Sequence, residues 1–159
     1  MKKHKFSCER GGLTIRGNLF QPEGENLPIA ILSHGFMANQ STMKGYAQAA
    51  AELGFAAFTY DFCGGCLWGR SDGKTTDMSV LTEVEDLKAV IAYASSLPFT
   101  DESRIVLIGA SQGGFVSALT AAQMGNKIER LVLFYPALCI PDDARKGQMM
   151  FAKFDPAEI

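Results

Sequence analysis

The segment Ile105–Phe115 constrains the fold more than any other part of this chain. A run of branched apolar residues, Ile105–Ile108, leads directly into the pattern G-x-S-x-G at Gly109–Gly113, and a helical pattern follows. On a strand-turn-helix connection, this pattern holds the serine out on a sharp turn where a substrate can reach it. We therefore predict a helix from Ser111 to about Met124, with Ser111 as the candidate nucleophile. The alternative is that Ser111 is only a helix N-cap.

Small residues surround this serine and allow the tight turn and close packing that the motif needs. They are Gly109, Ala110, Gly113 and Gly114. A second G-x-S-x-G occurs at Gly69–Gly73, but it follows a loop instead of a strand and precedes polar residues. The sequence therefore predicts that Ser71 is a loop residue.

Apolar runs alternate with amphipathic segments along the chain. Strands are predicted at Ile29–Ser33, Phe55–Tyr60, Arg104–Ile108 and Arg130–Tyr135, with helices at Gln40–Leu53, Thr82–Leu97 and Ser111–Met124. The start at Thr82 rests on a capping-box pattern with Glu85, and Pro98 ends that helix. Two alternating segments around Gly11 and Gly12 predict a β-hairpin before them. This order indicates one α/β domain with a mostly parallel sheet and helices on both faces.

The segment after Pro136 differs from the rest. Asp142–Lys153 has a helical pattern, and no further strand follows it. The sequence therefore predicts a core over residues 1–136, truncated before its last strands, and the start of a cap or lid over residues 137–159. The sheet would then end at an open edge, which is available for pairing with a second copy of the chain.

Composition excludes several kinds of partner. The net charge of −2 comes from 15 basic and 17 acidic residues without a block of either sign, which gives no indication of a nucleic-acid partner. No apolar run reaches membrane-spanning length, and the basic start Met1–Lys5 lacks the apolar core of a signal peptide. We therefore expect a cytoplasmic protein with reduced cysteines. Cys63 and Cys66 form a C-x-x-C pattern that favours a loop over a redox or zinc site, so no metal or cofactor is predicted.

A second segment with expected chemical function is Ser33–Phe36, at the end of the first predicted buried strand and directly after it. A tetrahedral intermediate needs two preorganised N–H donors, and in an elbow one comes from the residue after the serine, here Gln112. The other comes from the loop after an earlier strand, most plausibly Phe36, and Gly35 lets that backbone approach closely. His34 has two interpretations: a residue that shapes this loop, which we favour, or the general base.

Together these motifs resemble the N-terminal part of an α/β-hydrolase of the esterase/lipase-like branch, which contains cinnamoyl (feruloyl) esterases and monoacylglycerol lipases. The residues that carry the resemblance are His34-Gly35-Phe36, Tyr60-Asp61-Phe62-x-Gly64, Ser71-Asp72-Gly73 and Gly109–Gly114. It implies Ser111 as nucleophile, the backbone N–H groups of Phe36 and Gln112 as oxyanion donors, and a structural role for Asp61. The implied substrate is a small-molecule ester.

The chain departs from that family in one respect. Such enzymes continue through further strands that carry the triad acid and then the histidine. Here the only histidines are His4 and His34, both before Ser111. Asp142, Asp143 and Asp155 follow Ser111 where a cap would begin, and we expect them to be solvated or capping carboxylates.

Three functions stay open. The first is a serine hydrolase of carboxylic esters, inactive as this chain alone because the acid and histidine are missing. The second is a non-catalytic truncated module that binds or oligomerises. The third is a serine peptidase of the same fold.

Overall fold

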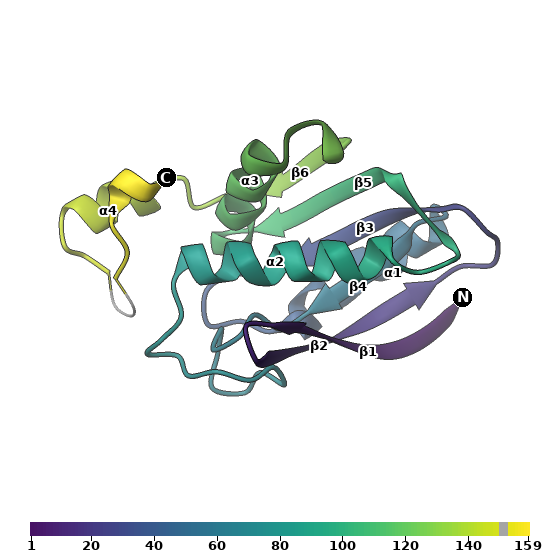
Figure 1. Ribbon diagram of the computed structural model, residues 1–159, viewed down its shortest axis with the longest axis horizontal. Helices are drawn as coiled ribbons and strands as arrows, with labels where there is room; N and C mark the ends of the chain where they lie inside the picture. Colours follow the sequence, from purple (N-terminus) through teal and green to yellow (C-terminus); the bar gives the residue numbers. More distant parts are fainter. Residues whose placement is uncertain (150–152) are drawn as a thin grey trace.

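A single mixed β-sheet organises the protein, and helices cover both of its faces (Figure 1). The computed structural model describes residues 1–149 and 153–159. The strands follow the order β1-β2-β4-β3-β5-β6 across the sheet. Their bounds are β1 (Lys2–Arg10), β2 (Leu13–Gln21), β3 (Leu27–Ser33), β4 (Ala56–Tyr60), β5 (Thr100–Ala110) and β6 (Arg130–Phe134). The helices are η1 (Gln40–Met43), α1 (Lys44–Glu52), α2 (Val80–Ser95), α3 (Gln112–Met124), η2 (Gly125–Lys127), α4 (Ile140–Arg145) and η3 (Pro156–Glu158).

β2 is the one strand of the sheet that runs opposite to the others. β1 pairs antiparallel with β2, and β2 pairs antiparallel with β4, whereas β3, β4, β5 and β6 are mutually parallel. The predicted hairpin is confirmed, with Gly11 and Gly12 at φ +55° and +81°, as its two-residue turn requires. The carboxyl ends of the four parallel strands therefore meet at one edge, where α/β proteins place their ligands.

The central strands are buried on both faces, which explains their continuous apolar runs. On β3, Ile31 packs into a cluster with Leu87 of α2 and Val116 of α3. Leu32, the next residue, packs into a second cluster with Ala47 of α1. In Figure 1, α2 and α3 accordingly lie in front of the sheet and α1 lies behind it. The predicted α/β class with helices on both faces is confirmed.

The predicted start of α2 at Thr82 is wrong by two residues. Ser79 is the N-cap: its hydroxyl accepts a hydrogen bond from the Thr82 N–H (3.3 Å), and the Ser79 N–H donates to the Thr82 hydroxyl (3.0 Å). Thr82 therefore closes a capping box that Ser79 opens. The pattern with Glu85 was a coincidence of spacing, because Glu85 instead pairs with Lys88 on the outer surface of the helix.

The predicted helix Asp142–Lys153 is confirmed only as far as Arg145 and is wrong for residues 146–149 and for Lys153. α4 begins at Ile140, with Pro141 in its first turn, and ends at Arg145. Gly147 has φ +72°, a left-handed conformation that ends a helix readily. Residues 150–152 of that prediction lie outside the described part of the chain. In Figure 1, α4 lies beyond the carboxyl ends of the parallel strands.

No helix within the described residues is both long enough and apolar enough to cross a membrane. The four cysteines are free thiols, and no group of three or more potential metal ligands forms among residues 1–149 and 153–159.

Two glycine substitutions test the packing of the sheet. A Cβ at Gly17 on β2 would lie 2.3 Å from the Thr59 carbonyl oxygen and 2.4 Å from the Phe6 ring, so Gly17→Ala should lower the free energy of unfolding by about 1–3 kcal/mol. A Cβ at Gly45 on α1 would meet nothing within 4 Å, so Gly45→Ala should raise it by about 0.5 kcal/mol through helix propensity. Urea unfolding of both variants measures the difference, and equal effects would contradict the packing described.

Candidate active site

Ser111 occupies a strained turn between β5 and α3. Its backbone has φ 53° and ψ −122°, a region that residues other than glycine rarely adopt and that costs on the order of 1–3 kcal/mol. Two hydrogen bonds from outside the turn hold it there. The Ser111 N–H donates to the Phe134 carbonyl of β6 (3.0 Å), and the Ser111 carbonyl accepts from the Ala137 N–H (2.9 Å). β6 and the residues after it thus help to maintain the conformation of Ser111.

Glycines around Ser111 bring the backbone of α3 into direct contact with the loop after β3. A Cβ at Gly113 would lie 2.3 Å from the His34 carbonyl oxygen, and one at Gly109 would lie 2.3 Å from the Gly113 carbonyl oxygen. No larger residue fits either position without moving the backbone. The first turn of α3 and residues 33–36 therefore lie against each other, although the sequence separates them widely.

The loop after β3 reaches Ser111 itself. A Cβ at Gly35 would be 3.2 Å from the Ser111 Cβ and 3.7 Å from its Oγ. The Gly35 carbonyl accepts the Ala38 N–H (3.1 Å), which closes a turn through Phe36. The structure thus brings together Gly35, Phe36, Ser111 and Gln112, which the sequence predicted to form one site.

His34 lies beneath this loop and is fully engaged there. Its Nδ1 is 2.9 Å from the Gly35 carbonyl oxygen, and its Nε2 is 3.2 Å from the Phe62 backbone nitrogen. A carbonyl only accepts and an N–H only donates, so the ring is the neutral Nδ1–H tautomer. Burial lowers the pKa of His34 in keeping with this state. The ring joins the loops after β3 and β4, and neither nitrogen is bonded to Ser111.

The other histidine is remote from Ser111. His4 lies on β1, where it pairs with Leu19 of β2, and β1 is the edge strand on the far side of the sheet from β5 and β6. Neither histidine of the chain is therefore placed to accept a proton from the Ser111 hydroxyl.

A cavity of about 240 Å³ opens beside Ser111, and we call it the Ser111 pocket. Phe36, Ser111 and Gln112 form one side of it. Its apolar wall comes from the start of α2 and from the segment after β6, namely Met78, Val80, Ala137, Ile140 and Met149. Pockets of this apolar kind with a few polar groups are typical of small-molecule sites.

Glu83 was not among the predicted site residues, although it contacts Gln112, which lines this pocket. Its side chain is 2% exposed, and it accepts a hydrogen bond from the Gln112 side-chain amide (Nε2–Oε2 2.8 Å). Burial raises the pKa of Glu83 to about 8, and the negative charge of Asp86 adds to this effect while the Gln112 bond opposes it. The available signal was its spacing of four residues from Leu87, which places a carboxyl group on the buried face of α2.

Asp86, on the same helix, is a second buried carboxylate with a different role. It pairs with the Arg10 guanidinium (2.7 Å) and accepts the Cys63 N–H (2.8 Å), so it joins the hairpin and the loop after β4 to α2. Burial raises its pKa, and the Arg10 and Cys63 contacts act in the opposite direction.

The second G-x-S-x-G lies in a loop fixed to β2. The Ser71 hydroxyl donates to the Asp61 carbonyl (2.5 Å) and accepts the Arg16 N–H (2.9 Å). The buried Asp61 carboxylate accepts from the backbone N–H groups of Gln40 (2.7 Å) and Arg70 (2.8 Å). The hydrogen bonds of Ser71 and Asp61 therefore give both side chains a structural role in fixing this loop.

The carboxylates after Ser111 also have local partners. Asp142 pairs with Arg145 one turn along α4, and Asp155 caps η3 by accepting the Ala157 N–H. Asp143 lines the Ser111 pocket.

The chain is similar to known proteins over most of its length. The sequence profile of the family Hydrolase_4 (Serine aminopeptidase, S33) matches residues 24–156. An uncharacterized 31.7 kDa protein of Escherichia coli is 37% identical over 122 residues, which cover 76% of this chain and 40% of that protein. The monoacylglycerol lipase of Mycolicibacterium smegmatis is 29% identical over 156 residues, covering 95% of this chain and 52% of the lipase.

Among solved structures, Est1E from Butyrivibrio proteoclasticus with bound ferulic acid superposes with a TM-score of 0.83 at 31% identity, covering 96% of this chain and 61% of Est1E. The chain therefore spans about two fifths to three fifths of the length of these relatives. Because the family profile matches most of the sequence, and the sheet order and turn geometry fit it, the chain belongs to the serine aminopeptidase S33 family of esterase/lipase-like α/β-hydrolases.

Proposed function

We propose that this chain carries the nucleophile and the oxyanion donors of a serine hydrolase that acts on small-molecule carboxylic esters. The observation that supports this most strongly is the strained backbone of Ser111 lying within contact distance of Gly35. The ester class is supported by the lipase relative and by the ferulic acid bound to Est1E. The segment 137–159 would be the start of a cap, since Ala137, Ile140 and Met149 line the Ser111 pocket.

The proposed chemistry is acyl transfer through Ser111. Its Oγ attacks the ester carbonyl, and the oxyanion that forms accepts hydrogen bonds from the backbone N–H groups of Gln112 and Phe36. The bond from the carbonyl carbon to the alcohol oxygen then breaks, and the alcohol leaves with the proton that the Ser111 hydroxyl lost. Water hydrolyses the acyl-enzyme, which releases the acid and restores the Ser111 hydroxyl. One such donor is worth about 10²–10³ in kcat in a serine hydrolase.

Neither histidine of the chain is placed to supply the base for that attack. Both ring nitrogens of His34 have other partners, and His4 lies at the opposite edge of the sheet. Removing triad members from a serine hydrolase leaves only the residual catalysis of the oxyanion hole and of binding. We therefore propose that these 159 residues alone turn esters over very slowly.

A fluorophosphonate probe tests the nucleophile. We expect slow labelling of the purified chain with one adduct, mapped to Ser111 by peptide mass spectrometry. Ser111→Ala should abolish the adduct, and Ser71→Ala should label at the wild-type rate although it loses stability through its bonds to Asp61 and Arg16. An adduct that maps elsewhere, or that persists in Ser111→Ala, would show that the assignment is wrong.

The rate of ester turnover tests the proposal that this chain alone is a slow catalyst. The purified chain should hydrolyse a p-nitrophenyl ester at least about 10³-fold more slowly than a serine hydrolase with a complete triad. Rapid turnover that disappears in Ser111→Ala would instead show that the chain provides a base. The same assay with a p-nitroanilide amide distinguishes an esterase from a peptidase.

Gly35→Ala tests the proposed oxyanion loop. The new Cβ would lie 3.2 Å from the Ser111 Cβ, so either the loop or Ser111 must shift by a few tenths of an ångström. Misplacement of catalytic groups by about 1 Å can cost as much as 10²-fold, and we expect labelling about 10- to 100-fold slower. Gly45→Ala, in open space on α1, should label at the wild-type rate. Equal rates for both variants would argue against an oxyanion role for this loop.

A further inference from the structure

Glu83 is a buried carboxyl group without a cationic partner. Among residues 1–149 and 153–159, none of the ion pairs involves it. A buried polar group of this kind costs free energy, and an apolar residue would pack into a helix face more favourably. Packing therefore does not account for a carboxyl group at this position, whereas its hydrogen bond to the Gln112 amide does.

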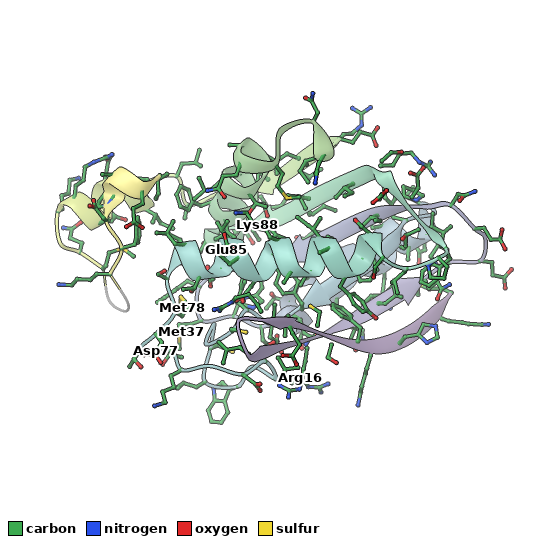
Figure 2. All side chains as sticks on the ribbon, in the orientation of Figure 1. Arg16, Met37, Asp77, Met78, Glu85 and Lys88 are labelled. Atoms are coloured by element: carbon green, nitrogen blue, oxygen red, sulfur yellow. The ribbon has the colours of Figure 1, made fainter. Side chains whose placement is uncertain are left out.

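The Gln112 side chain is held at a point where three parts of the chain meet. It is 8% exposed, donates to Glu83 (2.8 Å), and lies 3.8 Å from the Met78 sulfur with the same amide nitrogen. Met78 lies near the start of α2 (Figure 2), one residue before the N-cap Ser79, and like Gln112 it lines the Ser111 pocket. The contact thus connects the first turn of α2 to the first residue of α3.

This position matters because Gln112 directly follows Ser111. The first N–H groups of a helix have no partner within the helix, and here the Gly114 and Phe115 N–H groups turn back to the Ser111 carbonyl. Rotation of the Gln112 backbone would redirect its N–H group. A side chain anchored at its far end restricts that rotation.

We propose that Glu83 is a positioning residue of the oxyanion hole, which clamps the Gln112 side chain and so fixes the Gln112 backbone N–H beside Ser111. This inference rests on the proposed function, in which that N–H binds the oxyanion. Glu83 touches neither Ser111 nor a substrate in this scheme, and it acts only through Gln112.

The charge state of Glu83 gives the clamp a pH dependence. Besides Gln112, the groups that face it are Asp86 on the same helix and Tyr60 on β4, while Arg10 is paired with Asp86. With a pKa of about 8, the carboxyl group is neutral at pH 7 and ionises as the pH rises. A buried negative charge one side chain away from a developing oxyanion opposes its formation. The neutral form is therefore the competent one.

Two variants separate this role from simple packing. Glu83→Gln keeps an acceptor for the Gln112 amide but cannot ionise, whereas Glu83→Leu keeps bulk and removes the bond. We expect Ser111 labelling by the fluorophosphonate to be about 10- to 100-fold slower in Glu83→Leu. Below pH 7, the labelling rate of Glu83→Gln should lie within about threefold of the wild-type rate. The ratio of the two rates should then rise about tenfold by pH 9.

Glu85→Gln is the matched control, because Glu85 lies on the exposed side of α2 beside Lys88 (Figure 2). Its rate relative to the wild type should not change with pH. A constant Glu83→Gln ratio across pH 6–9, or wild-type labelling of Glu83→Leu, would overturn the proposal.

An NMR titration tests the clamp independently of any reaction. In the wild-type chain, the side-chain and backbone amide signals of Gln112 should shift together with a midpoint near pH 8. Glu83→Gln should abolish this shift, and Glu85→Gln should preserve it. Gln112 signals that do not respond to pH would refute the inference even if Ser111 is labelled. A normal titration without Ser111 labelling would instead refute the proposed function and leave the clamp intact.

Thermal unfolding provides a second measurement of the same group. The folded pKa of Glu83 is raised from 4.5 to about 8, so the native state binds its proton more tightly than the unfolded state. Stability from this group is therefore greatest below about pH 4.5 and falls as the pH rises to about 8. Glu83→Gln should remove that part of the decrease in Tm, leaving the contributions of Asp86 and the other carboxylates. An unchanged Tm profile would contradict the buried, titrating state.

Discussion

The candidate site depends on the backbone contact between the start of α3 and the loop after β3. Gly113 allows the first turn of the helix to rest on the carbonyl of His34, and this contact brings Gly35 up to Ser111. A methyl group at Gly113 would separate the two segments, because the atoms it would meet are the backbone carbonyls of Ser33 and His34, which cannot rotate away. The strained conformation of Ser111 is tolerated because packing on all sides determines it.

Two buried titratable groups of the protein, His34 and Asp86, use their hydrogen bonds to hold neighbouring segments together. His34 uses both ring nitrogens to join two loops, and Asp86 uses an ion pair and a backbone N–H to attach α2 to the hairpin. Such groups are fully satisfied and therefore rigid. Glu83 differs because its hydrogen-bonding partner is the neutral amide of Gln112. The buried carboxyl group of this helix that lacks a cationic partner thus contacts Gln112, a residue that lines the Ser111 pocket, where its protonation can affect chemistry.

The sequence predicted much of this architecture because strong local signals produced it. Continuous apolar runs identified the buried strands, and Gly11 and Gly12 marked the hairpin. The elbow could be located because the strand, the small residues and the helix are consecutive. The errors occurred where several local patterns competed: Thr82 resembled a cap although Ser79 occupies that position, and the helical pattern after Asp142 did not account for Gly147.

The tertiary partners of the site were beyond the reach of pattern analysis. Nothing in the spacing of the residues indicates that Glu83 meets Gln112, because that contact depends on how two helices cross over one sheet. The tautomer of His34 could not be predicted either. It depends on the hydrogen bond from the Phe62 N–H, and Phe62 belongs to the loop after β4, far from His34 in the sequence. Sequence alone could name the residues of the elbow, whereas their hydrogen bonding required the fold.

The two hydrogen bonds that hold Ser111 from outside have a consequence for how the protein assembles. They close loops that extend from Ser111 to Phe134 and to Ala137, so both partners come later in the chain than the turn they support. During synthesis, Ser111 leaves the ribosome before β6 does, and until β6 follows the turn can relax to an unstrained conformation. The nucleophile would therefore acquire its geometry only when β6 joins the sheet, as one of the last events of folding for this part of the chain.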